Sequence, residues 1–207
     1  DENRYFDITQ EVAKRSPQDI LWRITITNHG PDSAPIHMLP SVWLRNTWSW
    51  DVDGQAPVVK PSITREGDTL LIKHESLGNF RFHTAVSGDH SRKADWLFTE
   101  NDTNHESLGD RKNEFPYTKD AFHRYLVNGE KKAISPEDEG TKAAAHFVFD
   151  IPAGGSVTIM ARLHLLEEDS GIHGFDQFHE TVDARLREAD EFYADVIQPG
   201  ISDEENM

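Results

Sequence analysis

The segment 20–28 alternates between apolar and polar side chains, with Trp22, Ile24 and Ile26 on one face. A repeat of two residues is typical of a strand that buries one face and leaves the other in water. The segments 142–150 and 156–165 carry apolar residues at every second position in the same way. The sequence Ile-Pro-Ala-Gly-Gly lies between these two segments and predicts a compact hairpin connection.

Shorter extended runs complete a pattern of many strands separated by Gly, Pro, Asn and Asp turns. We expect these strands near 5–9, 36–44, 69–74, 80–87 and 95–99. Pro40 cannot donate a ladder hydrogen bond, so its strand belongs at a sheet edge or a bulge. The predicted fold class is mainly β, a sandwich or barrel, with a long polar surface insertion at 89–113.

The hydrophobic repeat changes near residue 175. Apolar residues then recur every three or four positions, at Phe178, Val182, Leu186, Ala189, Tyr193 and Val196. This spacing is one stripe of an amphipathic helix. The pattern predicts a helix within 175–197, ended by Pro199 and Gly200. We therefore expect a β-sandwich domain at 1–168 and a linker helix within 169–207.

Charge and composition argue against several classes of partner. The 207 residues include 21 basic and 37 acidic side chains, which give a formal net charge of −16. Nucleic acids and anionic membrane surfaces attract basic proteins, so we expect no nucleic acid and no membrane as a partner. There is no cysteine, which excludes disulfides and thiolate metal sites. The compartment stays open, with the cytoplasm slightly favoured.

The segment 43–50 concentrates tryptophan, since it holds three of the five in the chain. One hypothesis is a sugar-stacking platform made by Trp48 and Trp50, with Arg45 and Asn46 supplying hydrogen bonds. The other is core packing at the end of a strand, because indole rings are costly to leave in water. We favour the core for at least one of these two tryptophans.

Two polar segments supply the remaining candidates for carbohydrate binding. Glu100 and Asn101 open a stretch dense in hydrogen-bond acceptors, and Lys119, Asp120 and His123 form a polar group further along the chain. The alternative for both segments is a solvated loop in which Asn and Asp side chains cap turns. A glycosidase requires two carboxyl groups that flank the scissile bond, and sequence alone does not show such a pair.

Metal and cofactor sites are not predicted. The segment 51–54 begins like a calcium loop, but the later ligand positions and the closing Glu are missing. The histidines lack the spacing of a zinc motif such as H-E-x-x-H. No catalytic motif of high specificity is present, so the catalytic residues and cofactors predicted from the sequence are none.

The chain resembles the N-terminal region of bacterial glucosidase-like proteins of glycoside hydrolase family 63, which are relatives of mannosyl-oligosaccharide glucosidase. Four segments carry the resemblance: 43–50, 97–104, 116–123 and 140–146. The segment 188–194 is similar to the part that leads into the family's catalytic domain. The resemblance implies an antiparallel β-super-sandwich of the galactose-mutarotase type, then linker helices, then an (α/α)6 barrel. That barrel holds the general acid and base of an inverting glycosidase.

By this resemblance, the chain is a noncatalytic sandwich region of a longer hydrolase, without the earliest sandwich strands and inactive by itself. Its partners would be the catalytic domain and an oligosaccharide. The alternatives are a freestanding carbohydrate-binding module and a structural or interaction domain. We also expect weak homodimer formation through the apolar helix stripe or the tryptophan segment, because large exposed apolar patches recruit partners.

Overall fold

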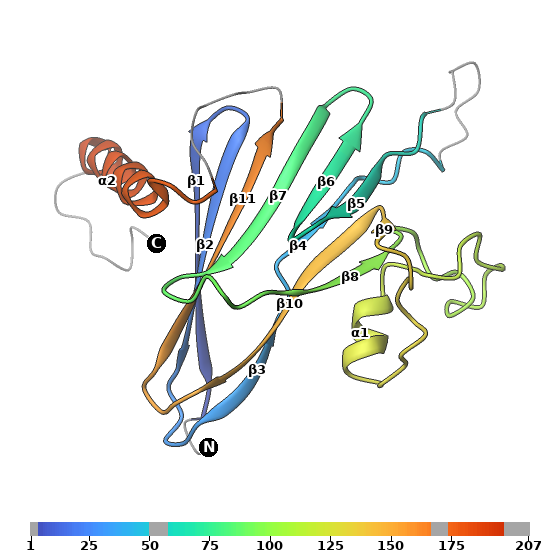
Figure 1. Ribbon diagram of the computed structural model, residues 1–207, viewed down its shortest axis with the longest axis horizontal. Coiled ribbons are helices and arrows are strands. Elements are labelled where there is room, and N and C mark those ends of the chain that lie inside the picture. The colour runs from blue at the N-terminus through green and yellow to red at the C-terminus, as the bar shows by residue number, and fades with distance from the viewer. Residues whose placement is uncertain (1–3, 50–57, 167–173, 197–207) are drawn as a thin grey trace.

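The computed structural model describes residues 4–49, 58–166 and 174–196 (Figure 1). The strands are β1 (Phe6–Ser16), β2 (Asp19–Asn28), β3 (Ala34–Met38), β4 (Ser41–Trp43), β5 (Ser62–Glu66), β6 (Thr69–His74), β7 (Gly78–Val86), β8 (Asp95–Thr99), β9 (Glu139–Gly140), β10 (Lys142–Ile151) and β11 (Ser156–Leu165). The helices are α1 (Ala121–Leu126) and α2 (Phe178–Val196). Neither helix in this part of the chain has the length and apolarity needed to cross a membrane.

The strands form two antiparallel sheets. The wide sheet has the order β1-β2-β11-β7-β6-β5-β9. The narrow sheet has β10 in its middle, with β3 and β4 along one edge and β8 along the other. This arrangement confirms the prediction of a mainly β, antiparallel fold followed by a C-terminal helix, and it is consistent with a β-sandwich.

β3 and β4 act as one edge strand. Met38 lies opposite Phe147 and Ser41 lies opposite Ala144, so the register against β10 continues unchanged across the break. The break falls at Pro40, whose carbonyl accepts a hydrogen bond from the Ala145 N–H at 2.9 Å but whose nitrogen has no hydrogen to donate. The predicted edge position of this proline is confirmed.

The prediction of a hairpin at 151–155 is wrong. β10 belongs to the narrow sheet and β11 to the wide sheet, so this turn carries the chain from one sheet to the other. Asn28, which is buried, holds the turn in place. Its Nδ2 donates to the Ile151 carbonyl at 2.8 Å, its N–H donates to the Gly155 carbonyl at 3.0 Å, and its carbonyl accepts from the Gly154 N–H at 2.9 Å. Alternation along each strand does not show which strand pairs with which.

The core lies between the two sheets. One cluster of buried side chains joins β2, β10 and β11 through residues such as Ile24, Phe147 and Ile159. A second cluster joins β5, β6, β7 and β8 through residues such as Ile63 and Phe98. Trp22 packs against both clusters. On β2, β10 and β11, whose alternation predicted one buried face, that face points to the opposite sheet.

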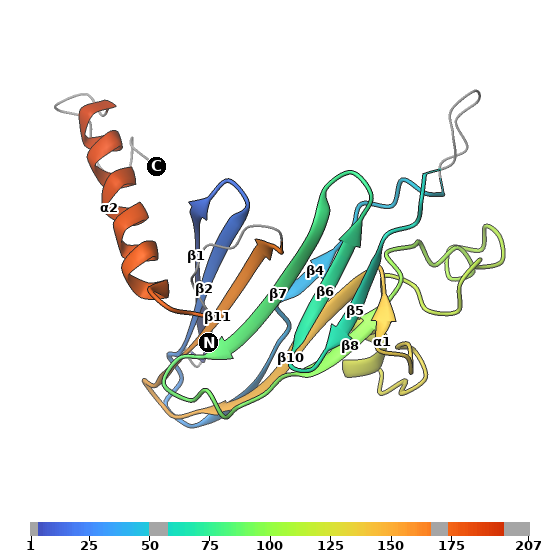
Figure 2. The same ribbon diagram turned by 45° about the horizontal axis from the view of Figure 1, so that its top comes forward.

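Helix α2 covers the outer face of the wide sheet with its first turns only. Phe178 and Val182 are buried there against Ala13, Leu21 and Met160. Figure 2 shows the helix rising away from the sheet beyond these turns. The later part of the predicted stripe is exposed, at Leu186, Ala189, Tyr193 and Val196. The sandwich thus leaves apolar surface uncovered, and the expected self-association stays a prediction.

An ion pair lies buried beneath the start of α2. The Nε and Nη2 atoms of Arg162 each donate to a carboxylate oxygen of Asp19 at 2.9 Å, and both residues are at most 3% exposed. Arg162 also donates to the Gly174 carbonyl, and Arg15 donates to the Asp176 carbonyl, both at 2.7 Å. These bonds attach the segment that leads into α2 to the outer face of the wide sheet. The sequence pattern did not predict a buried arginine on β11.

Gly140 marks a close backbone approach where β9 leads into β10. A Cβ atom at this position would lie 2.4 Å from the Thr99 carbonyl oxygen. Both segments are held by pairing, so we expect Gly140→Ala to lower the free energy of unfolding by about 2–3 kcal/mol, the range of overpacked interiors. Urea denaturation measures this loss.

A matched control for Gly140 is Gly88→Ala. Gly88 has a φ of +77° and no neighbouring atom within 4 Å of the new Cβ, so only the backbone conformation is penalised, by about 1 kcal/mol. A Gly140 variant no less stable than the Gly88 variant would contradict the steric argument.

Candidate functional site

The end of the narrow sheet, where β4, β8 and β10 converge, carries most of the polar residues predicted from the sequence. Asn101, two residues after the end of β8, connects all three strands. Its N–H donates to Thr141 Oγ1 and its Nδ2 donates to the Leu44 carbonyl, both at 2.8 Å. The Thr141 hydroxyl donates to Glu100 Oε2 at 2.6 Å, and Lys60 Nζ lies 3.0 Å from Glu100 Oε1. Glu100 and Asn101 therefore fix the ends of these strands.

Asn46 and Lys119 join the same network. Asn46 Nδ2 donates to Asp102 Oδ1 at 3.2 Å, and the Lys119 N–H donates to the Asp102 carbonyl at 2.9 Å. The Lys119 ammonium donates to Thr103 Oγ1 at 3.0 Å, while its carbonyl accepts from Lys142 Nζ at 2.7 Å. The segment after β4 and the segment before α1 are thus tied to the loop that leaves β8.

Asp120 stands at the start of α1 and faces this loop. Its carboxylate accepts hydrogen bonds from Thr118 Oγ1 at 2.5 Å and from Asn104 Nδ2 at 2.9 Å. Partial burial raises the pKa of Asp120, but these hydrogen bonds and the nearby Arg124 outweigh it, so the pKa lies below its ordinary value. At neutral pH the carboxylate is ionised and has lone pairs left to accept a bond from a ligand hydroxyl.

A polar pocket of about 810 Å³ opens beside Asp120. Its lining includes Asn104, Asn113, Phe115, Arg124 and Glu130. Arg124, one turn after Asp120 on α1, makes an ion pair with Glu130, with its Nη2 2.7 Å from Oε2. The pocket combines an aromatic ring, amides, a guanidinium and carboxylates, which are the groups that recognise sugar hydroxyls and ring faces.

Sequence reasoning found part of this pocket. Asn104 lies in the acceptor-rich stretch that Glu100 and Asn101 open, Phe115 lies four residues before Lys119, and Arg124 lies four residues after Asp120. That spacing would have placed Arg124 on the same face of a helix as Asp120. Glu130 carried no signal in the sequence, because only the turn after α1 brings it to Arg124.

The other predicted site residues that the structure describes do not line this pocket. Arg45 and His123 are exposed, and Trp48 is half-buried. Trp50, like the segment 51–54 that resembles the start of a calcium loop, lies outside the described residues. Trp43 was not a predicted platform residue, yet it is 61% exposed on the face of the narrow sheet that points away from the core, in register with Lys142.

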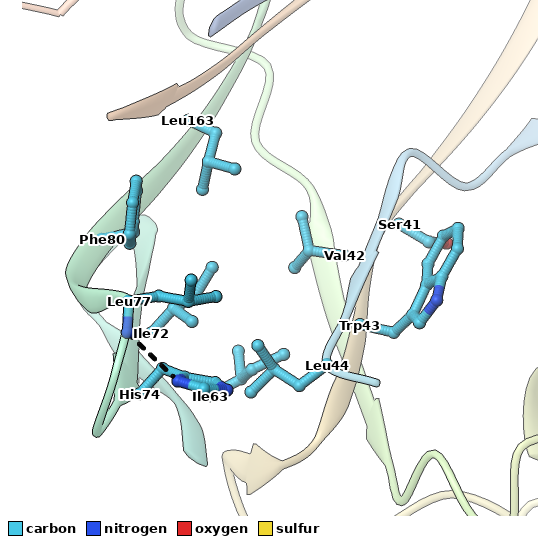
Figure 3. A pocket seen from close by; sticks show the side chains of 10 residues that line it. All are labelled: Ser41, Val42, Trp43, Leu44, Ile63, Ile72, His74, Leu77, Phe80 and Leu163. Atoms are coloured by element: carbon cyan, nitrogen blue, oxygen red, sulfur yellow. Dashed lines mark hydrogen bonds between the residues drawn. The ribbon is translucent and has the colours of Figure 1, made fainter. Parts of the chain in front are cut away.

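A second concave site lies between the sheets, away from these polar residues. It is an apolar cleft of about 340 Å³ (Figure 3). Val42 and Leu44 line it from the β4 side, and Leu77, Phe80 and Leu163 line it from the wide sheet. His74 also borders the cleft, where its Nδ1 accepts the Leu77 N–H at 3.3 Å and shapes the turn between β6 and β7. Because its lining is mainly apolar, the cleft is suited to bind apolar side chains rather than polar ligands.

Within residues 4–49, 58–166 and 174–196, no group of three or more His, Asp or Glu side chains is arranged to hold a metal ion. The polar pocket beside Asp120 is the candidate binding site.

Comparison with known proteins shows that the chain is similar in sequence to part of a longer yeast protein. No family model matches the chain. The chain is 33% identical over 233 aligned positions to Uncharacterized protein YMR196W of Saccharomyces cerevisiae (strain ATCC 204508 / S288c). The match covers 98% of this chain and 21% of that protein. The chain thus spans about a fifth of the length of the curated relative it matches, and it is similar to that fifth along nearly all of its own sequence.

Proposed function

We propose that this chain is a noncatalytic β-sandwich region of a longer, glucosidase-like glycoside hydrolase. In that protein it supports the catalytic domain and lends loops to the sugar cleft. Two features support the proposal. Four segments resemble family 63 glucosidase-like proteins in the same order, and the yeast relative is about five times longer than the stretch it shares with this chain.

The observation that carries the proposal is the polar pocket beside Asp120. Its walls come from the loop after β8 and from α1, and the hydrogen bonds of Asn101, Asn104 and Asp120 hold that loop against the sheet. Preformed polar groups bind a sugar without the cost of ordering a loop. In this proposal the acid and the base of an inverting mechanism belong to the catalytic domain, and Asp120 binds sugar rather than reacts with it.

A glucosidase-like protein that carries this region provides the test. Asp120→Ala should raise KM for an α-linked glucose oligosaccharide about tenfold and leave kcat unchanged, because a lost hydrogen bond to a charged group costs about 1.5 kcal/mol. Asp110→Ala is the matched control, since Asp110 lies in the same loop and contacts His105 instead of the pocket. An unchanged KM in the Asp120 variant would refute the proposed role of the pocket.

The alternative of a freestanding carbohydrate-binding module draws support from Trp43, whose exposed indole offers a stacking face. Submillimolar sugar binding by the 207-residue chain alone, lost in Trp43→Ala, would favour this alternative. Hydrolysis of the oligosaccharide by the chain alone would contradict both proposals. The exposed later turns of α2 are the feature that favours a structural or interaction domain.

A further inference from the structure

The core-facing surface of the wide sheet extends beyond the narrow sheet on the side of β3 and β4. Figures 1 and 2 show the ends of β1, β2 and β11 rising away from β3 and β10. Val12 lies opposite Trp22, on the same face of the sheet, yet it is 68% exposed. Leu77, at the border of the cleft, is 61% exposed. Apolar side chains that belong to the core side are therefore left in water.

The edge strand beside this surface has backbone groups ready for pairing. The Leu44 N–H donates to the Thr141 carbonyl and the Pro40 carbonyl accepts from Ala145, so even-numbered residues face β10. In an antiparallel ladder the odd-numbered Ser41 and Trp43 then point their N–H and C=O groups away from β10. Among the described residues, β4 pairs with β10 and with no other strand.

Pro40 does not protect this free edge. Its missing N–H falls on the β10 side, since its carbonyl bonds to β10. Sheet edges are usually shielded by lysine, by a bulge or by a proline whose ring faces outward, because an open edge attracts further strands. Figure 3 shows Val42 and Leu44 pointing into the cleft next to this edge, across from Phe80 and Leu163.

We propose that one further β-strand adds to the free edge of β4 and places its apolar side chains in the cleft. Such a strand has apolar residues at every second position, because one of its faces would meet Leu77 and Leu163 and the other would meet solvent. We commit to a segment of the same longer polypeptide as its source, since this chain aligns with only 21% of the yeast relative. This source rests on the proposed function.

A second copy of the chain does not fit this edge. Two-fold pairing of β4 with the β4 strand of another copy keeps both core faces on one side of the joined sheet. The wide sheet of each copy extends past β4 on that same side, so the two wide sheets would occupy the same space. A single strand without a second sheet attached avoids this collision.

The test uses the 207-residue chain and a synthetic ten-residue peptide in which valine alternates with lysine or threonine. Amide hydrogen exchange is followed at Ser41 and Trp43. We expect the peptide to slow exchange at both amides at least about tenfold, because each would donate to the added strand. A peptide of the same composition with its valines grouped together should have no effect.

Leu77→Glu should abolish this protection, whereas Leu108→Glu, an equally exposed leucine at 70% in a distant loop, should leave it intact. Absence of protection up to about 1 mM peptide, or equal protection by the grouped peptide, would overturn the proposal. Dimerisation of the chain alone with Ser41 and Trp43 already protected would assign the edge to a second copy and also overturn it. None of these readouts depends on the sugar pocket, so this proposal can fail while that one stands.

Discussion

Asp19→Ala is expected to lower the free energy of unfolding by about 3–5 kcal/mol, the cost of leaving a buried charge without its partner. The substitution leaves the buried guanidinium of Arg162 without its counter-charge. Arg162 is 2% exposed and makes two hydrogen bonds to the Asp19 carboxylate. The substitution also removes the acceptor that Arg15 uses at 3.3 Å. Denaturant unfolding followed by intrinsic fluorescence measures the loss.

The matched control is Glu66→Ala, which breaks the exposed pair between Glu66 and Arg81 on the same sheet. Surface ion pairs contribute about 0–1 kcal/mol, so this variant should unfold close to the parent chain. Replacing Asp19 and Arg162 together by apolar residues should recover part of the loss, because the desolvation of both charges disappears with them. Equal losses of unfolding free energy for Asp19→Ala and Glu66→Ala would contradict the prediction that breaking the buried ion pair costs more than breaking an exposed one.

Acidification from pH 7 to pH 5 is expected to destabilise the protein by about 2 kcal/mol through His83. Burial, together with the charges of His164, Arg162 and Arg81, lowers the pKa of His83 to about 4. An unfolded histidine takes up a proton near pH 6.5, whereas the folded His83 does not, so the unfolded state gains protons first as the pH falls. The stability is therefore complete above pH 6.5 and decreases between pH 6.5 and 4.

His83→Gln should flatten this pH dependence, and His90→Gln, at an exposed position on the β7–β8 connection, should leave it unchanged. The geometry makes His83 the sensitive group. Its Nε2 lies 3.1 Å from Nε2 of His164, and its ring meets that of Phe175 edge-on, with centroids 6.4 Å apart. The pKa of His164 is also lowered by burial, which adds to the effect. A pH profile that is the same with and without His83 would contradict the assignment.

The candidate site shows what residue type and position predict about a polar cluster. The sequence made Asn46, Glu100, Asn101 and Lys119 candidates for sugar binding, and that role stays a prediction. In the structure each of them forms hydrogen bonds that hold strand ends and loops together. Among the predicted residues with described positions, Asp120 alone lines the polar pocket. A sequence shows which polar groups are present but not which groups they bond to. The hydrogen-bond partner can lie far away along the chain, as Leu44 does for Asn101 at a separation of 57 positions.

The sequence by itself determined the strands whose side chains alternate and the helix whose apolar residues recur every three or four positions. The predicted bounds of β6, β8 and β11 match the structure, and α2 falls within 175–197. These features are local, because the period of side chains along a strand or a helix follows from backbone geometry alone. Short elements escaped prediction: β5 buries one apolar side chain, Ile63, and α1 has six residues.

Tertiary structure decided which sheet each strand joined. The sequence predicted a hairpin at 151–155, but this turn crosses from one sheet to the other. The apolar faces of β10 and β11 pack against each other across the core, so the two strands do not pair within one sheet. The same packing left Arg162 buried on the outer face, where α2 and Asp19 enclose it. Within residues 4–49, 58–166 and 174–196, it also left the outer edge of β4 without a paired strand. Sheet partners and uncovered faces depend on contacts between distant segments, and no local pattern encodes those contacts.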